Sequence, residues 1–263
     1  MPDRTRGLAV DAEVTPPVAS VGPESATPEQ DAVGNAAVAE QVAQAPVVAE
    51  AVEEKGAKYG LPKAVEDIAT KSPTLVSKLD TLLADGWVIS QGADGGGSFC
   101  DKAAKKIVYD PRGAVDPKAL VQTLAHEAGH ATFEADPYVD FGTLTKDEYV
   151  EVNAMSSLKD EGEATITNIE IRNEILNADP SIDIGVAGAK AEEYKALYEA
   201  GKLGSREALR IEIAKVFKDG ENPSTDATKT YGEYYGATYD KHWDDNHPPP
   251  APGGPTPAVA PTT

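Results

Sequence analysis

The feature that most constrains this fold is a pair of histidines, His126 and His130, with Glu127 directly after the first. On a helix, residues four apart lie on one face with Cβ atoms about 5–6 Å apart. That separation lets two imidazoles bind one Zn²⁺ ion at about 2.0–2.1 Å each. A catalytic zinc ion usually takes three protein ligands. A later part of the chain must therefore return to this helix and supply the third one.

Glu127 is the candidate general base. It stands one position after His126, so on a helix it points partly away from the metal and can hold a metal-bound water. Zinc lowers the pKa of that water toward about 7, and a carboxylate takes its proton as the water attacks a carbonyl. The sequence form of this arrangement is His-Glu-x-x-His. The alternative is a pair of surface histidines. Gly129 argues against it, because an interior helical glycine costs about 1 kcal/mol relative to alanine and indicates that backbone or substrate packs close.

Three downstream carboxylates are candidates for the third ligand: Asp147, Glu161 and Glu163. On a helical wheel of the segment 158–176, Glu161 falls within roughly 40° of the mean apolar direction and Glu163 roughly 160° away. A buried carboxylate is costly unless it is paired or binds a metal. We therefore expect Glu161 to be the ligand, with Glu163 as the fallback. The face of Glu163 is expected to be solvated, together with Thr167, Glu170 and Glu174.

Capping residues and hydrophobic spacing predict a mostly helical α+β domain. Ser72-Pro73 opens one helix, and Asp116-Pro117 opens the helix of the histidine pair, which should end near residue 135. Short apolar runs before Asp116 predict a small β-meander of two to four strands. Further helices are expected near 146–176, 189–200 and 205–218, followed by a tyrosine-rich stretch at 230–243.

Composition divides the chain into three parts. Residues 1–55 are rich in Ala, Val, Pro and Glu and lack aromatic residues, while residues 247–263 are rich in proline. Neither segment can bury enough apolar surface to offset the entropy of ordering its backbone, so both are expected to be disordered. Residues 56–246 are then expected to form one folded domain.

Charge and cysteine usage exclude several kinds of partner and site. The net charge of −20 makes nucleic acid and anionic membrane surfaces poor partners. Cys100 is the only cysteine, which excludes an internal disulfide and a thiolate-rich zinc site. The sequence has no run of about 18 apolar residues that could span a membrane, and we expect no signal peptide at its N-terminus.

The motifs together resemble those of the zincin metallopeptidases, in the branch that uses a glutamate as third ligand. HEAGH at 126–130, followed about 30 residues later by Glu161-Gly162-Glu163-Ala164, is similar to the Glu-x-x-Ala signature of that branch. The order LVQTLAHEAGHATF, DEGEATITNIEIRNEI and TYGEYY is similar to the metallopeptidase toxin domains of type VI secretion effectors. The resemblance implies a zincin-like domain at 56–246 that binds Zn²⁺ through His126, His130 and Glu161.

The same resemblance implies a function. It implies a zinc-dependent hydrolase of peptide or amide bonds, a secreted antibacterial toxin that acts on peptidoglycan or periplasmic protein. Such a protein is made in the bacterial cytoplasm without a signal peptide and is delivered to the target-cell periplasm. A secretion-system carrier and a cognate immunity protein are the implied partners. The alternatives are an intracellular regulatory metalloprotease that cleaves a specific protein, and a non-catalytic zinc-containing binding module.

The sequence departs from the family pattern in two places. Many relatives carry an aspartate four residues after the third ligand, which orients a histidine. Position 165 is a threonine, so another group must do this, and Asn168 is the candidate. GTLTKDEY at 142–149 is loosely similar to the Gly-Thr-x-Asp motif of peptidases with an aspartate ligand, but Asp147 stands four residues after Thr143 rather than two.

Zincins commonly use a tyrosine or histidine to stabilise the oxyanion of the tetrahedral intermediate, a role with a large effect on rate. The tyrosine-rich stretch supplies several candidates, and the sequence does not choose among them. They are Tyr231, Tyr234, Tyr235, Tyr239 and His242.

Overall fold

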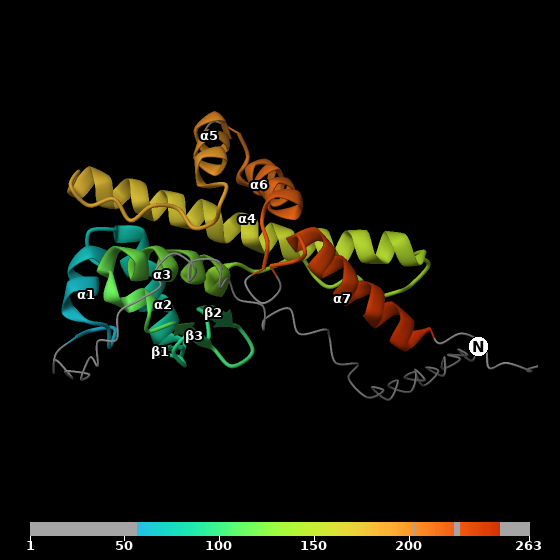
Figure 1. Cartoon of the computed structure of the whole chain (residues 1–263), viewed down its shortest axis with the longest axis horizontal. Coiled ribbons are helices and arrows are strands. Elements are labelled where there is room, and N and C mark those ends of the chain that lie inside the picture. The colour runs from blue at the N-terminus through green and yellow to red at the C-terminus, as the bar shows by residue number, and fades with distance from the viewer. Residues whose placement is uncertain (1–56, 202–203, 224–226, 248–263) are drawn as a thin grey trace, which may run out of the picture.

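The computed structural model describes residues 57–201, 204–223 and 227–247 (Figure 1). The segment 1–55 and the residues after His247, both expected to be disordered, lie outside the described residues. Within them the chain is mostly helical and has one small sheet, which confirms the predicted α+β class. Among these residues no helix combines the length and the apolar character needed to cross a membrane.

The elements follow the predicted order, with one short helix added before the first predicted one. They are α1 (Lys63–Ala69), α2 (Pro73–Ala84), β1 (Val88–Gln91), β2 (Phe99–Asp101), β3 (Lys106–Tyr109), the 3₁₀ helix η2 (Gly113–Val115), α3 (Pro117–Thr132), α4 (Lys146–Ala178), α5 (Ala191–Gly201), α6 (Arg206–Gly220) and α7 (Tyr231–Asn246).

Side-chain caps begin the helices where the sequence predicts them. The Ser72 side chain accepts a hydrogen bond from the backbone N–H of Leu75 at the start of α2. Asp116 does the same for Lys118 at the start of α3. In both helices a proline follows the cap, where no N–H is needed. The helix that carries the histidine pair is therefore fixed at its first turn.

The order of the strands differs from the predicted meander. The sheet order is β1-β3-β2, with β1 parallel to β3 and β2 antiparallel to it. The loop between β1 and β2 contains Gly95 and Gly97, both at positive φ. Asp110, directly after β3, accepts hydrogen bonds from the N–H groups of both glycines. This contact holds the loop across the end of β3, so β2 pairs on the far side of β3.

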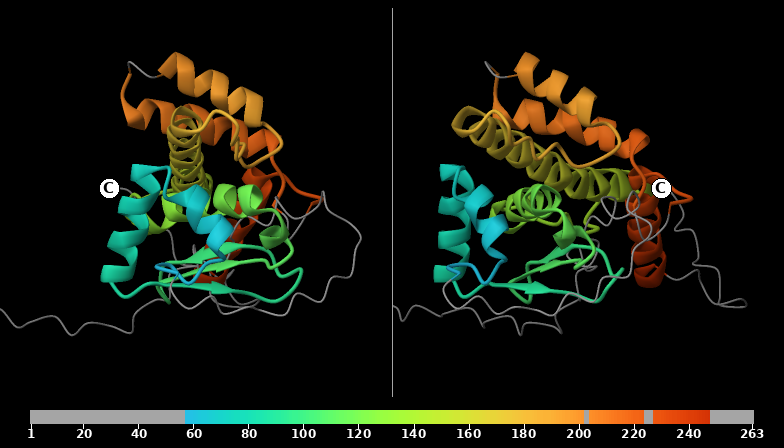
Figure 2. Two further views of the ribbon diagram at one scale, coloured as in Figure 1. Left: turned by 90° about the vertical axis from the view of Figure 1, so that its left-hand side faces the viewer. Right: turned by 60° about the vertical axis from the view of Figure 1, so that its left-hand side comes forward.

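The elements are stacked in layers. Figure 2 shows the sheet on one side of α3, α4 on the other side, and α5 and α6 beyond α4. Helix α7 packs against α4 (Figure 1). The buried apolar residues form two clusters. One joins α1, α2, α3 and the sheet to the end of α4, and the other joins the rest of α4 to α5, α6 and α7.

The prediction that the Glu163 side of α4 faces solvent is wrong. Glu163 is only 7% exposed and Thr167 is fully buried. Two guanidinium groups of α6 bind the Glu163 carboxylate, that of Arg206 at 2.7 Å and that of Arg210 at 2.8 Å. The prediction assumed that α4 packs on one side only, whereas α6 covers Glu163 and Gly129 of α3 packs against Thr167.

Candidate metal centre

Three side chains from α3 and α4 meet at one point. The Nε2 atoms of His126 and His130 are 3.1 Å apart, and Oε2 of Glu161 lies 3.5 Å from each of them. The corners of a tetrahedron around an ion at about 2.05 Å are roughly 3.3 Å apart. The three donor atoms are therefore spaced like ligands of one tetrahedral ion, and they form a group that could hold a metal.

All three side chains are removed from solvent. His126 and Glu161 are 1% exposed and His130 is 7% exposed. Burial lowers the pKa of His126, which favours the neutral imidazole that binds metals. Burial acts the same way on His130, but the carboxylates of Asp160 and Glu161 outweigh it and raise the pKa of His130 well above its ordinary value. Negative charge thus dominates the centre.

Glu127 lies beside the cluster without joining it. It is 1% exposed, and the backbone N–H of Cys100 on β2 donates a hydrogen bond to its carboxylate. Burial, followed by the charges of Glu161 and Asp160, raises the pKa of Glu127 to about 8. Its Oε2 atom has no hydrogen-bond partner among the described residues. A buried polar atom normally has one, so this oxygen is free to accept a proton from a ligand or a water.

Tyr235 of α7 fixes the orientation of Glu161. Its hydroxyl donates a hydrogen bond of 3.1 Å to Oε1 of Glu161, the oxygen that is not shared with the histidines. Burial raises the pKa of Tyr235 well above its ordinary value, so the phenol stays protonated and remains a donor. Oε2 of Glu161 is thereby left to face the histidines.

Tyr239 and His242 contact different parts of the fold, whereas Tyr231 lies near the centre, because burial and then the charges of Glu161 and Glu127 raise its pKa. The Tyr239 hydroxyl bonds to Ser157, and His242 Nδ1 lies 2.6 Å from the hydroxyl of Tyr149. The rings of Tyr231 and Tyr234 pack against the ring of Tyr235. Of the five candidates, the structure brings Tyr235 into hydrogen-bonding contact with a predicted ligand.

Asp160 was not predicted as part of the site. Its Oδ1 lies 3.1 Å from His130 Nδ1, and its Oδ2 lies 2.7 Å from Nζ of Lys102. No sequence signal distinguishes Asp160 from its acidic neighbours. The expectation that Asn168 orients a histidine is wrong, because its side chain bonds to the backbone N–H of Ala187 at 2.8 Å.

The remaining candidate ligand, Asp147, lies away from the cluster. It is exposed in the first turn of α4. Fourteen residues separate it from Glu161 on the same helix, which at about 1.5 Å per residue corresponds to roughly 20 Å. The structure therefore brings together His126, His130 and Glu161, and leaves Asp147 and Glu163 outside.

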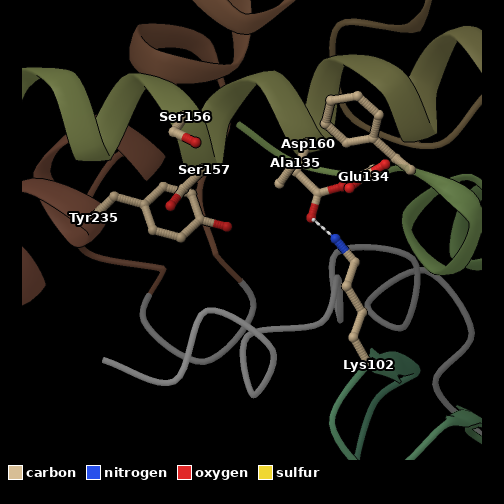
Figure 3. Close-up of a pocket in the computed structure, with 8 residues that line it drawn as sticks. Lys102, Glu134, Ala135, Ser156, Ser157, Asp160 and Tyr235 are labelled. Carbon is tan, nitrogen blue, oxygen red and sulfur yellow. Dashed lines mark hydrogen bonds and ion pairs between the residues drawn. The ribbon is translucent and has the colours of Figure 1, made fainter. Parts of the chain in front are cut away.

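A cavity of about 260 Å³ adjoins the centre. Figure 3 shows Lys102 and Asp160 on one side of it, with Tyr235 and two serines on the other. Asp160 contacts His130, and Tyr235 contacts Glu161, so the cavity wall includes groups that touch two of the three candidate ligands. The lining residues are Lys102, Phe133, Glu134, Ala135, Ser156, Ser157, Asp160 and Tyr235.

Comparison of the chain with protein-family models, with curated proteins and with solved structures finds no match. The resemblance to zincins therefore rests on the sequence motifs, and any function has to be inferred from the geometry of the site.

Proposed function

We propose that this protein is a zinc-dependent hydrolase of peptide or amide bonds. His126, His130 and Glu161 hold the ion, and Glu127 is the general base. The observation that carries the proposal is a donor triangle with tetrahedral spacing beside a buried carboxylate that has an unpartnered oxygen. A purely structural zinc site has no use for that second carboxylate.

Zinc supplies positive charge that polarises a substrate carbonyl and makes a water easier to deprotonate. Glu127 then accepts the proton of the attacking water. The N–H of Cys100 holds its carboxylate in place, and Oε2 is the atom available for the proton. The same carboxylate can then return the proton to the leaving amine.

Tyr235 is the proposed donor to the oxyanion. Among the five aromatic candidates it both lines the cavity and contacts a candidate ligand. A tyrosine has one O–H, so its bond to Glu161 has to be exchanged for a bond to the substrate oxygen as negative charge develops there. The cavity then receives the part of the substrate next to the cleaved bond.

An antibacterial role is the proposed biological setting, and it rests on the sequence resemblance. Peptidoglycan or a periplasmic protein is the proposed substrate, with delivery by a secretion system and inhibition by an immunity protein in the producing cell. Expression in a test bacterium with and without a periplasm-directing leader separates the targets. Lysis only with the leader supports this setting, and toxicity only without it favours an intracellular regulatory protease.

A non-catalytic zinc-binding module is the second candidate, and the near-complete burial of the four site residues favours it. In that case the zinc would have no coordination position open to water. X-ray absorption spectroscopy of the zinc-loaded protein in solution distinguishes the two, because a fourth oxygen ligand from solvent is required for hydrolysis.

The direct test uses the full chain loaded with one equivalent of zinc. It is incubated with purified peptidoglycan and with a denatured protein, each with and without a chelator. New amine ends are expected in one substrate, and they should disappear with the chelator and return when zinc is added back. If the zinc-loaded protein produces no new amine ends from either substrate, the hydrolase proposal fails. The metal content of the same sample tests the zinc site independently.

A further inference from the structure

We propose that Asp160 is the positioning residue of His130, and that Lys102 holds Asp160 in place. This inference rests on the zinc-binding half of the proposed function and does not depend on hydrolysis. Asp160 is not one of the three proposed ligands. It acts through the imidazole that it contacts.

Two consecutive residues of α4 face the two nitrogens of one ring. Oε2 of Glu161 lies 3.5 Å from Nε2 of His130, and Oδ1 of Asp160 lies 3.1 Å from Nδ1 of the same ring. The side chains of His130 and Asp160 are 9% and 20% exposed, so water competes little for this contact. A carboxylate oxygen this close to Nδ1 favours the tautomer that carries its proton on Nδ1, in which Nε2 offers its lone pair.

Two other polar residues of α4 near Glu161, Thr165 and Asn168, do not take this role. Thr165 is fully buried, and its hydroxyl has no hydrogen-bond partner among the residues that the structure describes. Asn168 is occupied by the backbone of Gly185 and Ala187. The carboxylate that orients a histidine therefore comes from the residue before the candidate ligand, and it orients the second histidine of the pair.

Lys102 completes the arrangement from the turn that follows β2. Its ammonium lies 2.7 Å from Oδ2 of Asp160, and the two side chains are 24% and 20% exposed. Asp160, Glu161 and Glu127 bring three carboxylates close together, so a cation here offsets their mutual repulsion. The same contact ties the sheet to α4. Lys102 thus fixes the rotamer of Asp160 and keeps its second oxygen turned toward His130.

The test compares zinc affinity in matched variants, measured by competition with a chromophoric chelator. Asp160→Ala is expected to bind zinc about 10–100-fold more weakly, the usual effect of losing such a partner. Asp160→Asn should lose less, because its amide oxygen can still face Nδ1–H. Lys102→Met should weaken binding, and it should add nothing in the Asp160→Ala background because Lys102 acts through Asp160.

Two controls remove one charge each near the same elements. Lys105 lies in the same hairpin, and Lys105→Met loses an exposed ion pair with Asp85 and a hydrogen bond to its backbone carbonyl. Asp136→Ala loses an ion pair with Lys159, in which the aspartate side chain is 56% exposed. Neither variant should change zinc affinity. The visible spectrum of the Co²⁺-loaded protein should change in the Asp160 variants and stay unchanged in both controls, since it reports the geometry of the ligands.

Two results overturn the proposal in distinguishable ways. If Asp160→Ala and Asp160→Asn bind zinc as tightly as the unaltered protein and give the same Co²⁺ spectrum, Asp160 has no positioning role and the metal centre stands. If the unaltered protein binds no zinc, the metal centre and the positioning role both fall. Should Asp160→Ala not fold, Asp160→Asn and Lys102→Met carry the same comparison.

Discussion

Gly129 of α3 lies against the backbone of Ala164 on α4. A Cβ atom at position 129 would stand 2.6 Å from the Cα atom of Ala164 and 3.1 Å from Cβ of Thr167. Non-bonded carbon atoms prefer separations of about 3.5–4.0 Å. The glycine therefore sets how closely the two site-bearing helices approach, and the sequence prediction that something packs close to it is confirmed. The neighbour is backbone.

Replacing Gly129 with alanine should separate the helices. Although alanine favours a helix by about 1 kcal/mol, overpacking of this contact should lower the free energy of unfolding by about 1–3 kcal/mol. Zinc affinity should fall as well. Gly236→Ala in α7 is the matched control, because nothing lies within 4 Å of its added Cβ. Denaturant unfolding and zinc titration of both variants provide the check, and equal stabilisation of the two would contradict the packing argument.

The Glu127→Gln variant should separate metal binding from chemistry. Glutamine has nearly the same shape but cannot take a proton, so hydrolysis should fall by about 10²–10⁴-fold. Bound zinc, measured by mass spectrometry of the native protein, should remain at one equivalent. A variant that keeps full activity would remove Glu127 from the mechanism.

Glu161 and Glu163 should differ sharply when each is replaced by alanine. Loss of Glu161 removes a donor atom, so bound zinc should disappear while the fold persists. Loss of Glu163 leaves the donors in place but removes the carboxylate that binds Arg206 and Arg210. Hydrogen bonds to charged groups contribute about 1.5–3 kcal/mol, so this variant should be less stable and still bind zinc. If the Glu163 variant lost zinc and the Glu161 variant kept it, Glu163 would be the ligand instead of Glu161.

Tyr235→Phe should slow hydrolysis by about 10²–10³-fold, the usual cost of losing a donor to an oxyanion. Tyr239→Phe is the control, because that hydroxyl bonds to Ser157. Its rate should stay close to that of the unaltered protein. The test is a comparison of kcat at saturating substrate. Equal kcat values for both variants would exclude Tyr235 as the donor to the oxyanion.

Asp110→Asn should reduce stability at neutral pH and flatten its dependence on pH. Burial alone would raise the pKa of Asp110, but hydrogen bonds from Arg112, Gly95 and Gly97 outweigh it and hold the pKa below the ordinary value. The stabilisation is therefore present above an unfolded pKa of about 3.9 and is lost as the pH falls through the lower folded value. Urea unfolding from pH 7 to pH 2 should show the two proteins converging at the acid end. If the difference in the free energy of unfolding between the two proteins stayed constant over this pH range, Asp110 would not be the source of the pH dependence.

The sequence was informative where one local rule decides the outcome. Ser72 and Asp116 predict the starts of their helices. In each case the side-chain oxygen accepts a backbone N–H of the first turn, and the proline that follows has no N–H that needs a partner. Glu161 could be chosen as the candidate ligand because it falls on the apolar side of its helix, and the structure places it beside both histidines.

Features that depend on distant segments were not predictable in the same way. The burial of Glu163 depends on Arg206 and Arg210, more than forty residues later. The strand order depends on Asp110 holding a glycine loop. Asp160 had no sequence signal, since its role requires knowing where the second nitrogen of His130 points.

The candidate centre also lies where the two apolar clusters meet. Residues of α3 around the histidines, such as Leu124 and Ala128, belong to one cluster, while Leu158, Ile166 and Tyr235 around Glu161 belong to the other. An ion held by both sides would act as a cross-link between two separately packed halves, much as a disulfide joins distant segments. Resistance of the whole domain to proteolysis would then rise and fall with the supply of metal, so zinc availability would set how long the protein survives.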